Sequence, residues 1–319
     1  MNCHHTPTSR ITRREFVAQT AVGAAGAIAL SNGNITQAAD AKTGWIDAHV
    51  HVWTPDTDKY PLVAGFKKAD MQPPSFTPEE LLSLAKPVGV DRIVLIQMSF
   101  YKFDNSYMLD TMKRFPGVFS GVAVIDSTAD NVRETMIDLK KQGMRGFRLA
   151  PWAAKPAEFF GTPGIERMWK CGADERLNMC LLINPNSLPV VDEMCRKHPD
   201  TPVVIDHFAR IGVDGEFRES DLNALCKLAA HKQVTVKISA FYALGKKQMP
   251  YDDLGPMIRK LLDAYGPERL MWATDCPFQV QNGHTYAASI ELVRDRMSDL
   301  SKSDKDSLLR KTAERVFYS

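Results

Sequence analysis

Two histidines separated by a single residue, His49 and His51, are the first candidates for chemistry in this chain. On an extended strand, side chains two residues apart point to the same face, so both imidazoles would face one site. A third histidine, His207, and an aspartate, Asp275, follow β-rich apolar runs further along the chain. Imidazoles and carboxylates bind zinc and transfer protons during hydrolysis. A lone histidine is more often a hydrogen-bonded core residue, but two at strand spacing with two such partners favour a site.

The segments that carry these residues are predicted strands. Short β-rich apolar runs alternate with helix-length amphipathic segments from Trp45 onward. Several runs lack polar alternation, as expected for strands covered on both faces. The predicted strands are Trp45–Val50, Arg92–Met98, Val118–Val124, Gly146–Leu149, Met179–Ile183, Pro202–Asp206, Val234–Ile238 and Leu270–Thr274. Eight strands with intervening helices over residues 40–319 predict an α/β fold of the (β/α)8 TIM-barrel type rather than an open doubly wound sheet.

Start signals mark several of the intervening helices. Residues 77–80, Thr-Pro-Glu-Glu, form a capping box with proline at the first helical position, and Ser187 and Ser303 are expected N-caps. Residues 56–74 form the one long irregular stretch, directly after the first strand. No G-x-G-x-x-G or G-x-x-x-x-G-K-[ST] motif follows any strand, so dinucleotide and nucleoside triphosphate binding lack their fingerprints.

Several polar residues stand at strand ends, where TIM barrels place their catalytic groups. Arg148 is expected to hold a substrate carboxylate with its planar guanidinium, and an ion pair with Asp206 is the alternative. Lys237 offers a compact cation for a carbonyl or carboxylate, or for an ion pair at the rim of the core. Asn184, at the end of the fifth strand, is also expected to contact substrate.

Three aromatic residues lie just beyond strand ends, namely Trp53, Trp152 and Tyr242. These side chains are expected to form walls of the pocket, although aromatic residues in barrels often simply pack. We therefore include Trp53 and Tyr242 among the candidate substrate-binding residues.

The first 39 residues are predicted to be a twin-arginine signal peptide. Arg13 and Arg14 precede Phe16 and a mildly apolar run, residues 21–30, rich in Ala and Gly. A basic segment before a short apolar run is typical of export signals, and the pair Ala38-Ala39 offers a cleavage site. We therefore expect a periplasmic protein whose partners are a small-molecule substrate and, during export, the twin-arginine translocon. An uncleaved amphipathic N-terminus is the alternative.

Composition and charge exclude several classes of function. The chain of 319 residues has 44% hydrophobic and 24% charged residues, as in an ordinary folded protein. It contains no apolar run of about 20 residues, which argues against a stable membrane association. Three basic residues and one acidic residue lie in the first 39 positions, so the remaining domain is formally neutral. A neutral domain has no electrostatic case for binding nucleic acid.

The sequence resembles the amidohydrolase superfamily, in particular its amidohydrolase-2 branch, which includes sugar lactonases and 2-pyrone-4,6-dicarboxylate lactonase. The resemblance spans residues 44–317 and rests on four motifs: Ile46–Trp53, Gly146–Arg148, Val204–Phe208 and Trp272–Pro277. The first motif reads Ile-Asp-Ala-His-Val-His-Val-Trp and the last reads Trp-Ala-Thr-Asp-Cys-Pro. The usual terminal Asn-Ala signature is altered to Thr-Ala at residues 312–313, which weakens assignment to a close subfamily.

This resemblance implies a hydrolase that opens a lactone, or cleaves an amide, of a small polar acid or sugar derivative. His49, His51, His207 and Asp275 would face the substrate and could hold one divalent ion, with zinc the expected metal. The three histidines would polarise the carbonyl directly or through the metal, with His207 counted as catalytic, while Asp275 would transfer protons. Metal-free catalysis is the alternative, because some lactonases of this branch work without metal.

Two departures from metal-binding relatives bear on the mechanism. Asn184 stands where many have a histidine, and no lysine stands at the fourth strand to bridge two ions, so a binuclear centre is not expected. A zinc-dependent non-oxidative decarboxylase is the second candidate function, but it would use the histidine that Asn184 replaces. From another class, an exported binding protein on a degenerate barrel would be favoured only by an incomplete His/Asp set.

Overall fold

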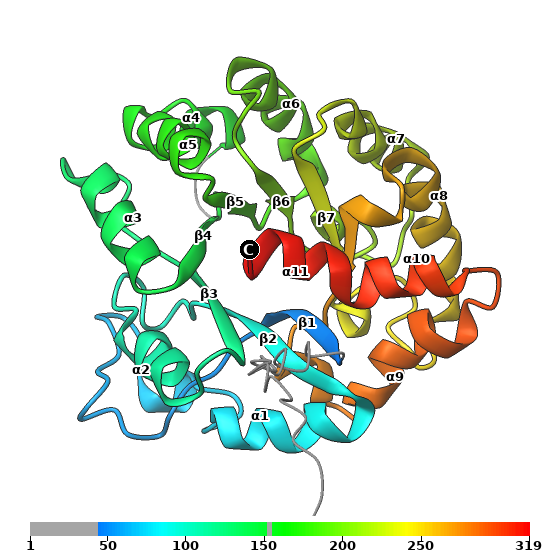
Figure 1. The fold of residues 1–319 in the computed structure, drawn as a ribbon, viewed down its shortest axis with the longest axis horizontal. Coiled ribbons are helices and arrows are strands. Elements are labelled where there is room, and N and C mark those ends of the chain that lie inside the picture. Colours follow the sequence, from blue (N-terminus) through cyan, green and yellow to red (C-terminus); the bar gives the residue numbers. More distant parts are fainter. Residues whose placement is uncertain (1–43, 152–154) are drawn as a thin grey trace, which may run out of the picture. The chain divides into compact units, whose positions relative to one another are not determined.

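The computed structural model describes residues 44–151 and 155–319. Within these residues, eight parallel strands lie side by side in sequence order and form a nearly closed barrel (Figure 1). The strands are β1 (Trp45–Val50), β2 (Val90–Ile96), β3 (Phe119–Ala123), β4 (Met144–Leu149), β5 (Asn178–Leu181), β6 (Val203–Ile205), β7 (Val234–Ile238) and β8 (Leu270–Trp272). The TIM-barrel prediction is confirmed, with strand boundaries shifted by a few residues. The expected signal segment, residues 1–39, and Trp152 lie outside the described residues.

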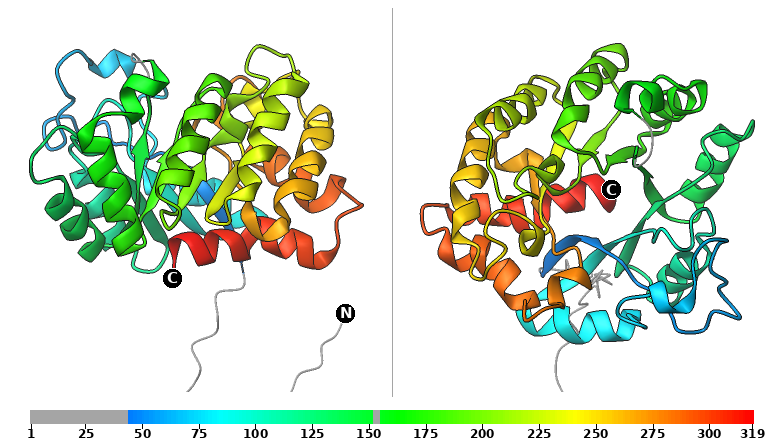
Figure 2. Two further views of the ribbon diagram at one scale, coloured as in Figure 1. Left: turned by 90° about the horizontal axis from the view of Figure 1, so that it is seen from above. Right: turned by 180° about the vertical axis from the view of Figure 1, so that it is seen from behind.

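Helices surround the barrel on its outer side (Figure 2). In chain order they are α1 (Pro78–Ala85), α2 (Ser106–Arg114), α3 (Val132–Lys141), α4 (Pro156–Phe160), α5 (Pro163–Glu175), α6 (Leu188–Lys197), α7 (Glu219–Lys227), α8 (Gly255–Tyr265), α9 (Tyr286–Glu291), α10 (Lys302–Asp306) and α11 (Thr312–Phe317). None of the helices in the described part of the chain is both long and apolar enough to span a membrane.

The caps of three helices test the predicted start signals. The capping box of α1 is confirmed, because the Glu80 backbone N–H donates to Thr77 Oγ1 and the Glu80 carboxylate accepts from the Thr77 N–H. Ser187 precedes α6, but its side chain makes no capping hydrogen bond. Ser303 was expected as a cap but lies inside α10, whose capping residue is Ser301. A serine two residues earlier in the same polar segment therefore supplies the cap.

Two apolar layers hold the barrel together. The outer layer fills the space between strands and helices, and it includes fully buried side chains such as Trp169 and Leu261. The inner layer lies within the barrel and includes Val94, Val204 and Met271. Helix α11 closes the barrel at one end, where Phe317 is buried against this inner layer.

Asp47 completes the barrel between β1 and β8. Its carboxylate accepts hydrogen bonds from the Thr274 backbone N–H at 3.0 Å and from the hydroxyls of Thr274 and Tyr286. Complete burial raises the pKa of Asp47 to about 6, and these donors partly offset that effect. The backbone N–H of Asp275 then donates to the carbonyl of His49 at 2.9 Å. Closure of the barrel therefore brings His49 and Asp275, the site residues most widely separated in sequence, together.

Candidate active site

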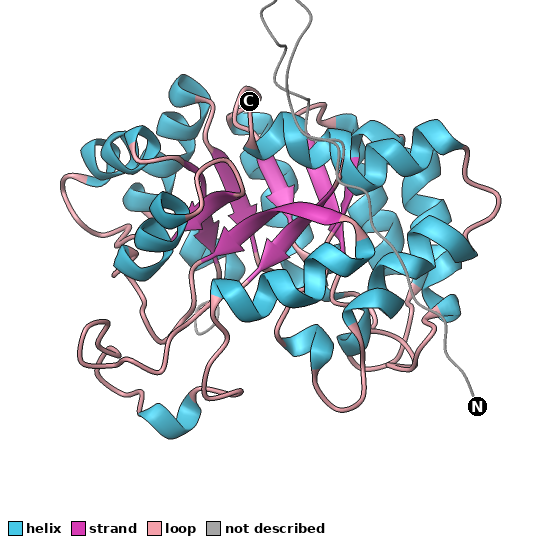
Figure 3. Ribbon diagram, turned by 60° about the horizontal axis from the view of Figure 1, so that its bottom comes forward, coloured by secondary structure: helices cyan, strands magenta, loops and turns pink. Residues whose placement is uncertain are grey.

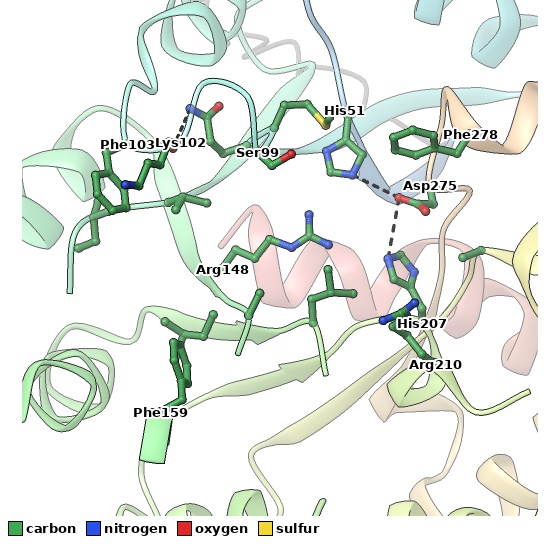
Figure 4. A pocket seen from close by; sticks show the side chains of 18 of the residues that line it. His51, Ser99, Lys102, Phe103, Arg148, Phe159, His207, Arg210, Asp275 and Phe278 are labelled. Carbon is green, nitrogen blue, oxygen red and sulfur yellow. Dashed lines mark hydrogen bonds and ion pairs between the residues drawn. The ribbon is translucent and has the colours of Figure 1, made fainter. Parts of the chain in front are cut away.

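A pocket of about 810 Å³ lies at the carboxyl ends of the strands. Figure 3 shows long loops extending from the barrel at the end opposite the C-terminus. Five sequence-predicted residues line the pocket: Tyr242 and, as labelled in Figure 4, His51, Arg148, His207 and Asp275. They come from different strands, so only barrel formation can bring them together.

Three imidazoles converge on one carboxylate oxygen at the base of this pocket. Asp275 Oδ1 lies 3.2 Å from His51 Nε2, 3.4 Å from His49 Nε2 and 3.8 Å from His207 Nε2. All four residues are buried, with His49 directly below the pocket surface. The second oxygen of Asp275, Oδ2, accepts a hydrogen bond from the Tyr242 hydroxyl at 2.7 Å. Both carboxylate oxygens are therefore fixed in direction.

In His51 and His207, the ring nitrogen that faces away from Asp275, Nδ1, is fixed by a second contact. His51 Nδ1 lies 2.8 Å from the carbonyl oxygen of Ile96, and a carbonyl can only accept, so this nitrogen carries the hydrogen. Nε2 of a neutral His51 is then a lone pair that faces the Asp275 carboxylate. His207 Nδ1 lies 2.8 Å from the hydroxyl of Ser239. Two acceptors at 3.2 Å leave a place for a cation or a proton between them.

The same geometry fits a single metal ion. Ligand atoms of His49, His51 and Asp275 all lie within 4.8 Å of one another. His49 Nε2 is buried and has no hydrogen-bond partner among the described residues, which is unusual for a buried polar atom. Two imidazoles and one carboxylate are a donor set that zinc binds in catalytic sites. These three residues could hold a divalent ion, and His207 lies outside this tightest set of the four expected ligands.

Burial and charge set the protonation states of the cluster. Burial lowers the pKa of His207 to about 4 and that of His49 well below its usual value, so both rings are neutral near pH 7. Burial acts to raise the pKa of Asp275, but the surrounding imidazoles offset it and hold that pKa below its usual range. Asp275 is therefore an ionised carboxylate beside the uncharged imidazoles of His49 and His207, as metal binding or proton acceptance requires.

A buried ion pair lies beneath the cluster. Lys237 Nζ is 3.0 Å from Asp206 Oδ1 and 3.2 Å from His49 Nδ1, and both charged side chains have no exposed surface. Arg148 Nη2 lies 3.9 Å from Asp206 Oδ2. Burial acts to raise the pKa of Asp206, but Lys237 and the other neighbours hold it well below its usual value. Asp206 therefore balances the buried charge of Lys237, and Arg148 lies at a longer distance from the same carboxylate.

Comparison with known proteins identifies the family. A family model described as amidohydrolase matches residues 46–318, which include every strand except the first residue of β1. The chain belongs to the amidohydrolase family. It is a hydrolase of that family.

Several relatives of this amidohydrolase are lactone hydrolases. It is 28% identical over 242 residues to a 4-sulfomuconolactone hydrolase of Rhizobium radiobacter, covering 74% of this chain and 76% of the relative. It is 28% identical over 246 residues to an L-fucono-1,5-lactonase of Burkholderia ambifaria, covering 75% of this chain and 82% of the relative. It is also 28% identical over 247 residues to a 2-pyrone-4,6-dicarboxylate hydrolase of Comamonas testosteroni, covering 73% and 77%.

Solved structures share the fold of this amidohydrolase. A probable 2-pyrone-4,6-dicarboxylic acid hydrolase from Acinetobacter baumannii, with citric acid bound, superposes with a TM-score of 0.72 at 21% identity, covering 86% of this chain and all of that one. An amidohydrolase from Burkholderia multivorans with bound zinc gives 0.71 at 21% identity, covering 86% and 99%. A 5-carboxyvanillate decarboxylase from Sphingomonas paucimobilis gives 0.62 at 13% identity, covering 86% and 99%.

The structure of the amidohydrolase corrects three of the expected substrate contacts. Trp53 is fully buried and does not line the pocket, because its strand-like pairing with Phe76 turns the indole into a cluster of aromatic rings. Asn184 is exposed outside the pocket, where its side-chain oxygen accepts from Arg210 at 3.0 Å. Lys237 does not reach the pocket either, because it is paired with Asp206 inside the barrel.

Left-handed backbone conformations position several site residues of the amidohydrolase. His207 to Arg210 all have positive φ, between 51° and 59°, and Asp275 has φ 69°. Each such non-glycine residue costs about 1 kcal/mol or more, and the surrounding packing must compensate for that cost. The left-handed turn carries both His207 and Arg210 into the pocket lining. The sequence contains no glycine at these positions that could have indicated the turn.

Sequence reasoning missed the outer wall of the pocket. Loops after β1 and β2 contribute Phe66, Lys102 and Phe103, and helix α4 contributes Phe159. The long irregular stretch at residues 56–74 was the available signal for one of these loops. Nothing in the spacing of the three phenylalanines indicates that they share a pocket, because they come from two loops and a helix that are separate in the sequence.

Proposed function

We propose that this amidohydrolase opens the lactone ring of a polar acid or sugar derivative. The observation that carries the proposal is the convergence of three imidazoles on the Asp275 carboxylate, beside Arg148, in one pocket. Relatives named as hydrolases of 4-sulfomuconolactone, L-fucono-1,5-lactone and 2-pyrone-4,6-dicarboxylate support a lactone over an amide. Arg148 would bind the acidic group of the substrate through its planar guanidinium.

In the proposed reaction, Asp275 transfers a proton between water and the leaving oxygen. Water attacks the carbonyl carbon while the carboxylate accepts one of its protons. The bond from that carbon to the ring oxygen then breaks, and the ring oxygen takes the proton from Asp275. The product is an open hydroxy acid. Tyr242 keeps the carboxylate oriented through its hydrogen bond to Oδ2, and His207, neutral near pH 7, lies where it can polarise the carbonyl.

A bound divalent ion would add electrophilic chemistry at the same place. His49, His51 and Asp275 would hold it, and zinc is the expected metal for two imidazoles and one carboxylate. Such an ion acts as a Lewis acid on a carbonyl oxygen. The role of the chain's own residues in holding and moving the proton is the same in the metal-free alternative.

A panel assay tests the proposed function. The purified enzyme is incubated with acidic lactones, sugar lactones and the corresponding amides, with and without a chelator, and ring opening is followed by proton release. We expect hydrolysis of at least one acidic lactone at a rate well above background. If no lactone is opened while a hydroxybenzoate or carboxyvanillate is decarboxylated, the decarboxylase alternative replaces this proposal.

Two alternatives are less well supported by the site. A decarboxylase of the same superfamily would draw on a fifth-strand histidine, but Asn184 occupies that position and its side chain lies outside the pocket. A small-molecule binding protein on a degenerate barrel would not need a complete cluster, and here His49, His51 and His207 all surround Oδ1 of Asp275.

We predict at most one tightly bound divalent ion per chain. Among the described residues, only one group of three potential ligands has its atoms close together. Metal analysis of the purified protein by mass spectrometry should therefore give one divalent ion or fewer per chain. His51→Ala should lower this metal content. Two tightly bound ions per chain, both required for activity, would contradict the single site.

Arg148→Met should separate substrate binding from chemistry. A charge-assisted hydrogen bond to the substrate contributes about 1.5–3 kcal/mol, so its loss should raise KM for an acidic lactone about tenfold or more. The value of kcat should fall less, because the contact exists before and during the reaction. A neutral lactone is the matched control, and its KM should be unchanged. An equal rise in KM for both substrates would show that Arg148 does not hold the acidic group.

We also propose export by the twin-arginine route to the periplasm. Conservative replacement of both arginines, Arg13→Lys with Arg14→Lys, should leave folded protein in the cytoplasm, because the translocon reads the arginine pair. Cell fractionation measures the outcome, with Arg10→Lys as the control outside the pair. Normal periplasmic accumulation of the double variant would contradict the proposed export by the twin-arginine route.

A further inference from the structure

The pocket has a polar base and an apolar outer part. Its base carries the imidazoles, Asp275 and Arg148, as described above. Its outer part is lined mainly by the apolar side chains of Phe66, Phe103, Phe159 and Val213, with Lys102 beside Phe103. Figure 4 shows Arg148 between the Asp275 cluster and the rings of Phe103 and Phe159. A ligand that reaches both parts must therefore pass the guanidinium group.

The outer part contains most of the exposed large apolar side chains of the described chain. Phe66 is 41% exposed, Phe103 is 40% exposed and Val213 is 36% exposed. Only Leu84 and Met249 are comparably exposed elsewhere in the described residues, and neither lines the pocket. Exposed apolar side chains gathered around one cavity are typical of a binding site rather than of ordinary surface.

Two of the apolar rings, Phe66 and Phe103, are held at the pocket by contacts with the loops after β1 and β2. Phe66 contacts the ring of Phe100, with 6.4 Å between centroids, and the Val63 backbone N–H donates to the Phe100 carbonyl at 3.0 Å. The ammonium group of Lys102 lies 4.6 Å from the centroid of the Phe103 ring. The loops after β1 and β2 thus support one another while each leaves a phenyl ring in the wall.

The size and polarity of this space exclude a fully polar substrate as its best occupant. A cavity of about 810 Å³ is in the upper part of the range for drug-sized ligands, and a six-carbon sugar lactone would leave much of it to water. Sugar hydroxyls placed against phenyl rings would lose hydrogen bonds to water without replacement. Alkyl or aryl groups there would instead remove apolar surface from water, at about 0.8 kcal/mol per buried methylene.

From this division of the pocket we infer that the substrate is an acidic lactone that carries an apolar alkyl or aryl substituent. The inference rests on the proposed lactonase function. The lactone carbonyl lies at the Asp275 cluster, the acidic group contacts Arg148, and the substituent extends between Phe103 and Phe159 toward Phe66. The product is the corresponding hydroxy acid with the same substituent.

A series of γ-lactone carboxylates with one variable group tests the inference. 5-Oxotetrahydrofuran-3-carboxylate is used unsubstituted and with hexyl or phenyl at position 2, beside a galactonolactone. We expect kcat/KM to be at least about tenfold higher for the hexyl or phenyl compound than for the unsubstituted one. Phe103→Ser and Phe159→Ser should each reduce this ratio several-fold. Leu84→Ser is the matched control, because Leu84 is 36% exposed on α1 and outside the pocket.

The outcomes separate the inference from the proposed function. If the unsubstituted compound or galactonolactone is hydrolysed as well as the hexyl and phenyl compounds, the lactonase stands and the apolar subsite is rejected. The same conclusion follows if the two phenylalanine variants keep the wild-type ratio. If no lactone in the series is hydrolysed and none of the hydroxy-acid products binds by calorimetry, the proposed function fails and this inference fails with it.

Discussion

Asp275→Asn is expected to lower kcat for lactone hydrolysis at least about a hundredfold while the barrel remains folded. Asparagine has nearly the same size and can still accept a hydrogen bond from Tyr242, but it cannot take a proton from water. The reduced pKa of Asp275 means that wild-type enzyme holds the carboxylate in its ionised form throughout the neutral range. The loss should therefore be nearly independent of pH between about 6 and 8.

Two measurements distinguish loss of proton transfer from loss of structure or metal. Circular dichroism and thermal unfolding should match the wild type, and the exposed Asp200→Asn serves as a control that keeps full activity. Metal content is measured on the same samples. A variant that keeps its metal but loses turnover has lost the proton-transfer group. Near-normal turnover of a folded Asp275→Asn enzyme would show that another group moves the proton.

The barrel could be predicted because its signals are local and repeated. Unbroken apolar runs such as Val203–Ile205 mark strands covered on both faces, and the Thr77 capping box marks the first helix. The convergence of His51 and Asp275 follows from topology alone, since parallel strands end on one face of a barrel. The site could therefore be located without knowing the distances between its side chains.

The direction of individual side chains could not be predicted in the same way. Trp53 follows the His49–His51 pair closely in sequence, yet its pairing with Phe76, at the other end of the segment between β1 and α1, sends the indole into the core. The side chain of Asn184 accepts a hydrogen bond from Arg210, which lies in a turn of left-handed backbone. That turn contains no glycine, so the sequence does not indicate it. Both outcomes depend on contacts between segments that are not adjacent in sequence.

The position of Lys237 within the barrel could not be predicted either, because a residue's place on a strand does not show how far below the pocket its side chain lies. It stands on β7, and Ser239, two residues later on the same face, reaches His207 at the level of the pocket. Lys237 is one layer lower, where its ammonium group meets Asp206 and lies 5.2 Å from the centroid of the Phe317 ring. The sequence offers Arg148 as an ion-pair partner for Asp206, but Lys237 makes the shorter contact, 3.0 Å against 3.9 Å.

Lys237→Met should therefore destabilise the protein by about 3–5 kcal/mol, more than a change at a substrate-contacting residue would. The substitution leaves the Asp206 carboxylate fully buried with only the more distant Arg148, at 3.9 Å, as a cationic partner. Urea unfolding followed by fluorescence gives the change in free energy. Lys232→Met, at an exposed position just before β7, is the matched control and should change stability by less than about 0.5 kcal/mol.

A double-mutant cycle with Asp206→Asn identifies the cause of that destabilisation. If the unpaired carboxylate is responsible, Lys237→Met combined with Asp206→Asn should be more stable than Lys237→Met alone by about 1 kcal/mol or more, because the buried charge is gone. Loss of the contact between the ammonium group and the Phe317 ring would persist in the double variant and give no such recovery. Additive losses in the cycle would thus assign Lys237 to packing, whereas recovery assigns it to the charge balance beneath His49, whose Nδ1 lies 3.4 Å from the same carboxylate oxygen.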